Sequence, residues 1–402
     1  MKLYKRNIFD KIKPYLGDET IIVIIGARQV GKTHILHYIQ NFLKTKNHKT
    51  LYYDLEFPNL LYLLNQGTDA FIIDLESRGY IKGENIFVFI DEIQYLNNPS
   101  SFLKIIADHY KNIHLIVSGS STFDIKTKFT NSLAGRTINF EVFPLSFSEF
   151  ITFKESVYTN ISKLSSDGLK HIQMLYKEYI IYGGYPKIVL ESDIVKKQQH
   201  LLQLIDTYVR KDIRDLADIT NIYKFNSILK VLAFQSGQLL NVASLSRETD
   251  ISQPTLHKYL SILEETFIIK MVTPFSHSPS VEISKNPKIF FLDSGLQSLL
   301  WMGQFQNIIQ GNIFETNIFS ELVKKYGREV IHFWRTKIHQ EIDFIIEYEV
   351  GKILPIEVKT NFQKFNVRTM KSFCNKYKIK DWKVISLEGM KEAKNNIYPW
   401  EI

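Results

Sequence analysis

Short apolar runs alternate with longer amphipathic stretches over the first third of the chain. Four runs rich in β-forming residues, IIVII, LYYD, IFVFI and HLIVS, lie between Glu19 and about Val142. Such runs are typical of buried strands, and the amphipathic stretches between them are long enough for helices that cover a parallel sheet. The pattern predicts an α/β domain over residues 1–145.

The alternation stops after Phe143-Pro144, and the next stretch has mostly helical periodicity. It predicts a helical domain over residues 146–275. Within it, Val242–Thr249 and Pro254–Glu265 predict two helices with a short break between them, followed by the strand-like run IIKMVTPF. This order of helix, turn, helix and strand resembles a winged helix.

Strand patterns return from Lys285 onward. The runs KIFFLD, VIHFWR, IDFIIEY, KILPIEVK and DWKVISL are separated by helical stretches such as Gly311–Lys325. They predict a third, small α/β domain over residues 276–402. The expected fold class is therefore α/β, with a helical domain between two sheet-containing ones.

Composition narrows the class of protein. With 45% hydrophobic and 23% charged residues, the chain has the composition of a folded globular protein. The aliphatic run Ile21–Ile25 is far shorter than the roughly 20 apolar residues of a membrane-spanning helix, and the basic start is not followed by a secretory apolar region. We therefore predict a cytoplasmic protein without a membrane partner.

Charge and cysteine content add two further expectations. The single cysteine, Cys374, excludes an internal disulfide framework and a multi-thiolate zinc site. The net charge of +8 and the pI of about 9.1 favour anionic partners such as nucleic acid. A surplus of lysine is also common on ordinary solvated surfaces, so charge alone does not identify a partner.

The clearest motif follows the first apolar run. It matches G-x-x-x-x-G-K-[ST], with a strand before it and a predicted helix after it. The glycines allow consecutive N–H groups to face a phosphate, Lys32 can reach the β and γ phosphates, and the Thr33 hydroxyl can bind Mg²⁺. We therefore predict that ATP and Mg²⁺ are cofactors. The predicted nucleotide-binding residues are Gly26, Ala27, Arg28, Gln29, Val30, Gly31, Lys32, Thr33 and His34.

Two carboxylates follow the apolar run IFVFI, in the sequence IFVFIDEIQ, which predicts a buried strand that ends in acids. Asp91 is expected to hold the Mg²⁺ shell together with Thr33, and Glu92 to orient and deprotonate the attacking water. An acidic strand end in solvent would be ordinary by itself. Beside a phosphate loop on a neighbouring strand, the catalytic interpretation is favoured.

Further candidates follow the run HLIVS. Ser118, in Ser118-Gly119-Ser120-Ser121, could touch the γ-phosphate or its water, or could belong to an ordinary strand end. Arg136 is a candidate for stabilising transition-state charge, in its own site or in that of a neighbouring subunit. Arg210 and Arg214 are weaker candidates for the same role.

Several strings taken together resemble one family. GARQVGKT, the acidic strand end DEIQ, SGSS, LAGR followed by FPLSFSEF, and YGGYP are similar to prokaryotic AAA-type P-loop ATPases, also called archaeal-type ATPases. The resemblance covers nearly the whole chain. It implies Walker B and sensor positions for Asp91, Glu92 and Ser118. It also implies a lid and winged-helix region, and a C-terminal domain of uncharacterised function.

A second constellation lies in the last third. Glu357 and Lys359 share one face of a predicted strand because side chains alternate along it. Asp343 on the adjoining strand and Glu315 on the preceding helix could join them. The four residues resemble the motif of the PD-(D/E)XK nuclease fold, in which carboxylates bind Mg²⁺ and the lysine helps to activate water. The alternative is a salt-bridged strand pair on a structural or DNA-docking domain.

Two functional hypotheses remain open from the sequence. The first is an ATPase coupled to DNA binding or processing through its C-terminal nuclease-like domain. Side chains of the winged-helix candidate could also face DNA, or its helices could instead pack against the nucleotide domain. The second is a nucleotide-dependent regulatory switch whose C-terminal domain binds protein and is catalytically inactive. A homo-oligomer is compatible with both. The candidate DNA-facing residues are Ser252, Gln253, Thr255, His257 and Lys258.

Overall fold

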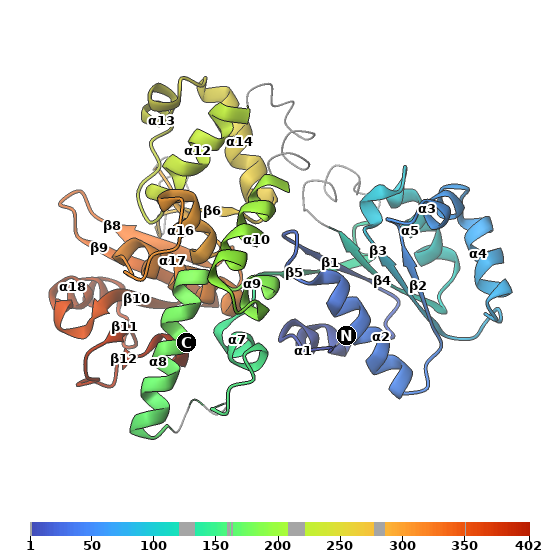
Figure 1. Cartoon of the computed structure of the whole chain (residues 1–402), viewed down its shortest axis with the longest axis horizontal. Coiled ribbons are helices and arrows are strands. Elements are labelled where there is room, and N and C mark those ends of the chain that lie inside the picture. Colours follow the sequence, from blue (N-terminus) through green and yellow to red (C-terminus); the bar gives the residue numbers. More distant parts are fainter. Residues whose placement is uncertain are drawn as a thin grey trace. The chain divides into compact units, whose positions relative to one another are not determined.

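The computed structural model describes residues 2–119, 133–158, 161, 164–207, 222–276, 286–349 and 351–402. Contacts divide the chain into two compact units, Met1–Phe143 and Pro144–Ile402 (Figure 1). The division lies two residues from the predicted boundary at 145/146. Among the described residues, no helix is long and apolar enough to cross a membrane.

The first unit contains a five-stranded sheet in the order β2-β3-β4-β1-β5, and every neighbouring pair is parallel (Figure 1). The predicted parallel α/β architecture is confirmed. Because all strands point the same way, the segments that follow β1, β3 and β4 meet at the end of the sheet where the strands finish, its carboxyl end. The strands are β1 Ile21–Gly26, β2 Thr50–Asp54, β3 Ile86–Asp91, β4 Ile113–Gly119 and β5 Thr137–Val142.

Helices surround this sheet. Helix α2 begins directly after the phosphate loop and packs on β1, β3 and β4, with Ile35, Leu36 and Ile39 buried. Their spacing of one, three and four residues places them on one face of the helix. The helices are α1 Ile8–Ile12, α2 Lys32–Thr45, α3 Pro58–Asn65, α4 Thr68–Ser77 and α5 Pro99–His109.

The second unit starts with helices, as predicted. The two helices of the winged-helix candidate are present as α13 and α14, and the residues between them include Asp250 in a left-handed conformation. The helices up to this point are α7 Phe147–Phe153, α8 Ser166–Tyr182, α9 Pro186–Leu190, α10 Ile194–Thr207, α12 Ile222–Phe234, α13 Val242–Thr249 and α14 Gln253–Glu265.

A second five-stranded sheet follows in the order β12-β11-β10-β9-β8. The pairs β8/β9 and β9/β10 are antiparallel, and β10/β11 and β11/β12 are parallel, so α18 forms the crossover between β10 and β11. The predicted strands are confirmed. The elements are α16 Ser294–Met302, α17 Gly311–Tyr326, β8 Ile331–Arg335, β9 Glu341–Glu349, β10 Lys352–Asn361, α18 Val367–Tyr377, β11 Lys383–Glu388 and β12 Asn396–Ile397.

The predicted boundary at 275/276 does not separate two compact units. Strand β6 (Ile269–Val272) pairs with β7 (Lys288–Phe291), so a cut at 275/276 would divide a two-stranded antiparallel sheet. The Tyr176 hydroxyl on α8 also donates to Asn317 Oδ1 on α17 at 2.7 Å, with both residues buried. The helices and the small sheet therefore share one core, which the strand pattern along the chain did not indicate.

The motif Tyr182–Pro186 has a structural role in this unit. The Gly184 N–H donates to Asp293 Oδ2 at 2.7 Å, and Asp293 Oδ1 accepts from the Leu296 N–H at 2.8 Å to cap α16. A Cβ on Gly184 would lie 2.5 Å from the Leu145 carbonyl oxygen. Only glycine therefore allows this close approach.

Replacing Gly184 by alanine should lower the stability of the second unit by about 1–3 kcal/mol, because the new methyl group has no space. Urea unfolding followed by tryptophan fluorescence measures this unit selectively, since all four tryptophans, Trp301, Trp334, Trp382 and Trp400, lie in it. The control is Gly311→Ala, since a Cβ there would meet nothing within 4 Å. Equal midpoints for the two variants would contradict the close-approach explanation.

Candidate functional site

The phosphate-loop motif forms the turn between β1 and α2. Its backbone is left-handed at Gln29 (φ 60°) and at Gly31 (φ 96°), which is the residue before the helix. A Cβ on Gly26 would collide with the Val142 carbonyl oxygen of β5. The loop thus curls over the amino end of α2, where first-turn N–H groups have no intrahelical acceptor and attract an anion.

The Lys32 ammonium is folded back over this loop. Lys32 Nζ donates to the carbonyl oxygens of Gly26 at 3.0 Å and of Ala27 at 2.9 Å, and only 6% of the residue is exposed. Its positive charge is therefore held beside the curled backbone. This is the place where a phosphate group would need neutralisation.

Asp91 is the centre of a hydrogen-bond network at the carboxyl edge of the sheet. Its Oδ2 accepts from the Thr33 hydroxyl at 2.6 Å and from the Tyr52 hydroxyl at 2.9 Å, and its Oδ1 accepts from the Ser118 hydroxyl. The residue is 2% exposed. Three neighbouring strands and the start of α2 are therefore tied together through one carboxylate.

Thr33 and Asp91 fit a magnesium ion by their chemistry. Both offer oxygen atoms, which Mg²⁺ prefers, and the hydrogen bond between them already brings these oxygens together. Burial raises the pKa of the Tyr52 phenol, and the nearby Asp91 carboxylate raises it further, so Tyr52 stays a neutral donor.

Glu92 lies in a left-handed conformation (φ 55°) immediately after β3. Its N–H donates to Ser118 Oγ at 3.3 Å, and its carboxylate accepts from the Gln94 side-chain amide. Burial raises the pKa of Glu92, while Lys32 and the Gln94 hydrogen bond act in the opposite direction. A carboxylate with a raised pKa is a stronger base toward water than an exposed glutamate.

The N-terminal segment holds the phosphate loop in place. The buried Arg6 guanidinium donates to the Val30 carbonyl oxygen at 2.7 Å and to the Phe143 carbonyl oxygen at 2.9 Å. The Tyr4 N–H donates to His34 Nε2 at 2.9 Å. Burial lowers the pKa of His34, which favours the neutral ring that accepts this bond.

The remaining predicted loop residues have different environments. Ala27 and Val30 are fully buried, so their side chains pack in the core and hold the loop against it. Arg28 is half-buried, and its charge favours the ionised form of Glu92. The His34 ring contacts the N-terminal segment, because it accepts the hydrogen bond from the Tyr4 N–H.

Two residues of this region were missed from the sequence. Tyr52 lies in the run LYYD, whose alternation placed it on a strand but did not indicate a bond to Asp91. Arg6 lies in a basic segment that carries no motif. Only the tertiary structure shows the contacts of these two side chains.

Arg136 lies at the opposite end of the sheet, where the strands begin. Its carbonyl oxygen accepts from the N–H of Ile21, the first residue of β1, and its guanidinium donates to Asp108 at 2.7 and 3.1 Å. The six residues of β1 separate it from the phosphate loop, which corresponds to about 20 Å. The structure does not bring Arg136 to the site of its own chain, and its action in a neighbouring subunit stays a prediction.

Four other residues considered above cannot be placed. Ser120, Ser121, Arg210 and Arg214 lie outside the residues that the structure describes. Ser118 is the last hydroxyl of its strand that the structure describes, and it donates to Asp91; its contact with a γ-phosphate or its water stays a prediction.

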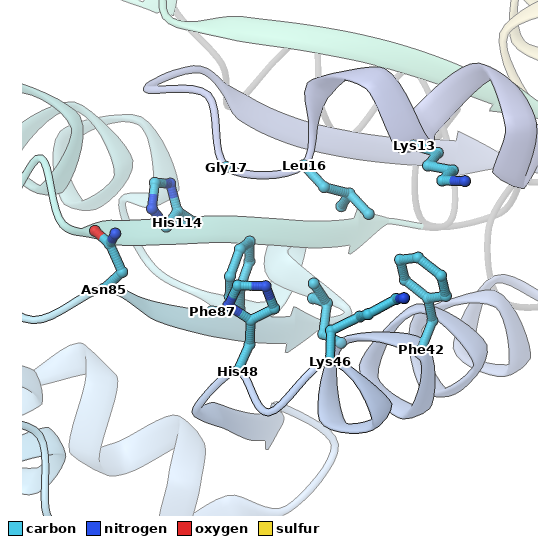
Figure 2. A pocket seen from close by; sticks show the side chains of 10 residues that line it. Lys13, Leu16, Gly17, Phe42, Lys46, His48, Asn85, Phe87 and His114 are labelled. Carbon is cyan, nitrogen blue, oxygen red and sulfur yellow. The ribbon is translucent and has the colours of Figure 1, made fainter.

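A cavity of about 280 Å³ in the first unit is distinct from this site (Figure 2). Its wall includes Phe87 and His114, the second residues of β3 and β4, with ring centroids 4.9 Å apart. Lys13 and Lys46 also line it. The cavity therefore lies at the amino end of the strands, away from the phosphate loop.

The C-terminal sheet brings together three of the four nuclease-like residues. Lys359 Nζ donates to Glu357 Oε1 at 2.6 Å and lies 3.7 Å from Asp343 Oδ2. Asp343 Oδ2 also accepts from the Val358 N–H at 2.7 Å, which joins β9 to β10. Burial raises the pKa of Glu357 to about 7.

Glu315 has a different partner that the sequence did not indicate. Its Oε1 lies 3.4 Å from Lys288 Nζ, and the same ammonium lies 2.5 Å from Glu341 Oε1. Burial raises the pKa of Glu315, although Lys288 opposes the shift. The weak indication in the sequence was a lysine opening the apolar run KIFF.

This group does not fit Mg²⁺ in the arrangement observed. One oxygen of each of the carboxylates of Glu315, Glu341, Asp343 and Glu357 already lies against an ammonium group, so a divalent cation bound there would have to displace the ammonium groups. Among the residues that the structure describes, no group of three or more His, Cys, Asp and Glu side chains is arranged to hold a metal ion.

Helix α14 presents part of the predicted DNA-facing set to solvent. Ser252, Gln253, His257 and Lys258 are exposed, and Thr255 is half-buried. The Ser252 hydroxyl also accepts from the Thr255 N–H, so it caps the helix. These positions are therefore accessible to a partner, and their role stays a prediction.

Three family matches divide the chain. Residues 18–151 match the family described as AAA domain. Residues 173–306 and 310–401 match two families described as domains of unknown function, DUF8612 and DUF4143. The first match, together with the parallel sheet and the phosphate loop, supports a P-loop ATPase domain of the AAA type in the first unit.

The chain is also similar to curated proteins along most of its length. It is 26% identical over 364 residues to an uncharacterized protein of Haemophilus influenzae, which covers 88% of this chain and 86% of that protein. It is 27% identical over 371 residues to an uncharacterized protein of Methanocaldococcus jannaschii, which covers 90% of this chain and 78% of that protein.

Solved structures show weaker likeness. AMPPCP-bound DnaA from Aquifex aeolicus is 16% identical, with a TM-score of 0.30 over 66% of this chain and 90% of that one. Cdc6p from Pyrobaculum aerophilum is 12% identical, with a TM-score of 0.34 over 84% of this chain and 90% of that one. At these scores the likeness adds nothing to what the strand order shows.

Replacing Arg6 by methionine should weaken nucleotide binding by about tenfold, because charge-assisted hydrogen bonds of this kind contribute roughly 1.5–3 kcal/mol and one of them holds the loop. Titration with a fluorescent ATP analogue measures the change. The control is Lys5→Met, which removes an exposed cation paired with Asp10 outside the loop. Unchanged affinity in Arg6→Met would show that the loop keeps its shape without this contact.

Proposed function

We propose that the first unit binds ATP with Mg²⁺ and hydrolyses it. The observation that supports this most directly is the shared Asp91 carboxylate, which accepts hydrogen bonds from the Thr33 and Ser118 hydroxyls at the edge where the phosphate loop curls. The phosphate loop and the Asp91 carboxylate therefore lie side by side. If the loop were an ordinary turn that fits the motif by chance, no such carboxylate would be expected beside it.

In this proposal, binding depends on backbone and charge. Amide groups of the loop and the amino end of α2 donate to phosphate oxygens, and Lys32 turns from the Gly26 and Ala27 carbonyl oxygens toward the β and γ phosphates. Thr33 and Asp91 would hold Mg²⁺, which neutralises developing charge on the phosphate oxygens when bound.

Glu92 would then act on water. Its carboxylate accepts a proton as the water oxygen forms a bond to the γ-phosphorus and the bond to the β–γ bridging oxygen breaks. Ser118 lies at hydrogen-bond distance from the Glu92 N–H and can help to position the water. Arg136 can contribute only to the site of a second copy, because it lies at the far edge of its own sheet. A homo-oligomer is therefore part of the proposal.

Glu92→Gln should retain ATP binding and lose hydrolysis by about 10²–10⁴-fold, the usual effect of removing a general base. Phosphate release and analogue binding are measured on the same preparation. Lys32→Ala serves as the contrasting variant, since it should lose binding itself. If Glu92→Gln hydrolyses ATP at the normal rate, Glu92 is not the base.

We also propose that the second unit binds duplex DNA through exposed side chains of α14. Gln253, His257 and Lys258 are exposed within six positions of this helix, and the chain carries a net charge of +8. An exposed helix following a short turn can enter the major groove of duplex DNA. The regulatory-switch hypothesis instead requires no DNA contact and assigns partner binding to the C-terminal domain.

The paired substitution His257→Ala and Lys258→Ala should weaken binding to duplex DNA and reduce the slope of log affinity against log salt by about 1, as expected for one lost phosphate contact. Fluorescence anisotropy over a range of salt concentrations measures both quantities. Lys371→Ala, an exposed lysine on α18, is the control. No DNA binding by the unsubstituted protein at low salt would favour the regulatory switch.

A further inference from the structure

Lys288 is a buried cation that the ATPase proposal does not use. It opens β7, pairs with Val272 of β6, and forms an isolated bridge with Leu239. Only 3% of the residue is exposed. Its backbone is therefore fixed on two sides, and its side chain has little contact with solvent.

The ammonium group of Lys288 is directed at carboxylates. Nζ lies 2.5 Å from Glu341 Oε1 and 3.4 Å from Glu315 Oε1. It also lies 5.9 and 5.6 Å from the ring centroids of Phe290 and Phe333. A charge placed in such surroundings is stable only because the two carboxylates compensate it.

The neighbouring half of the group is compensated in the same way. Lys359 Nζ donates to Glu357 Oε1 at 2.6 Å and to the Val358 carbonyl oxygen at 3.1 Å, and it lies 3.7 Å from Asp343. Arg335 Nη1 lies 3.3 Å from Glu341 Oε2. Four carboxylates are thus matched by three basic groups, all supplied by the protein itself.

We propose that Lys288 is the built-in counter-ion of this carboxylate group, in place of the Mg²⁺ that a nuclease would require, and that the C-terminal sheet binds no divalent metal and cuts no phosphodiester bond. Withdrawal of the Lys288 ammonium from the two carboxylates would leave a buried charge uncompensated, because only 3% of the residue is exposed. A divalent ion among the same oxygens would be repelled by this ammonium.

The inference goes beyond the ATPase proposal and does not depend on it. It concerns residues of the second unit, so its failure leaves the assignments of Lys32, Asp91 and Glu92 unchanged. ATP hydrolysis measured in the same preparations separates the two outcomes.

The experiment is a titration of the full chain with Mn²⁺, followed by electron paramagnetic resonance, in the absence of nucleotide. The unsubstituted protein and Asp343→Asn should bind Mn²⁺ equally. Lys288→Met keeps the aliphatic volume but removes the charge. It should gain a site at least about tenfold tighter, since a neighbouring charge changes ionic equilibria by one to three decades. The double variant Lys288→Met with Asp343→Asn should lose the gained site.

Lys270→Met is the matched control. Lys270 lies on the paired strand β6 and is bound to Glu264 at 3.0 Å and Glu329 at 3.1 Å, so its removal takes an ion-paired lysine from the same small sheet. It should not create a metal site. Gain of Mn²⁺ binding in this control as well would show that the effect is not specific to Lys288 and would overturn the inference.

Three further results would overturn it. The first is a Mn²⁺ site in the unsubstituted protein that Asp343→Asn abolishes, and the second is plasmid cleavage with Mg²⁺ that Lys359→Ala abolishes. The third is a folded Lys288→Met protein, judged by its thermal transition, that gains no site. If Lys288→Met does not fold, the comparison of the unsubstituted protein with Asp343→Asn and the plasmid assay decide the matter alone.

Discussion

The first unit depends on one carboxylate that is buried but hydrogen-bonded by neutral groups. Asp91 receives hydroxyl hydrogens from Thr33, Tyr52 and Ser118, which come from the start of α2 and from strands β2 and β4. A buried charge without partners would be very costly, and these hydroxyls remove much of that cost. Because hydroxyls are neutral, they do so without cancelling the negative charge that a cation requires.

The C-terminal sheet solves the same physical problem in the opposite way. Its carboxylates are also largely buried, but they face the ammonium groups of Lys288 and Lys359. The ammonium groups give these carboxylates hydrogen-bond donors and neutralise their negative charge at the same time. The contrast supports the proposals that the first acidic group holds a nucleotide-bound metal and that the second is neutralised by the protein alone.

Elements distant in sequence hold each unit together. In the first, Arg6 ties the Val30 carbonyl oxygen of the phosphate loop to the carbonyl oxygen of Phe143. In the second, the buried Glu321 on α17 accepts from the Phe147 N–H and from the Tyr179 hydroxyl, while Lys324 lies 2.9 Å from it. These contacts close long loops of chain, so they specify the tertiary arrangement more than any local preference does.

Local pattern was sufficient to predict the parallel sheet, the phosphate loop and the acidic strand end. Strand alternation and the glycine-lysine-threonine spacing depend on neighbours within a few residues, and the observed α13 has the predicted bounds Val242–Thr249. Local pattern also placed Glu357 and Lys359 on one face.

Tertiary structure alone decided what those residues contact. It placed Arg136 at the far edge of its sheet, joined β6 to β7 across the expected boundary at 275/276, and brought Lys288 to Glu315 and Glu341. The reason is physical. Side-chain alternation fixes which face a residue occupies, but the partner of a buried charge is set by which distant strands and helices pack beside it.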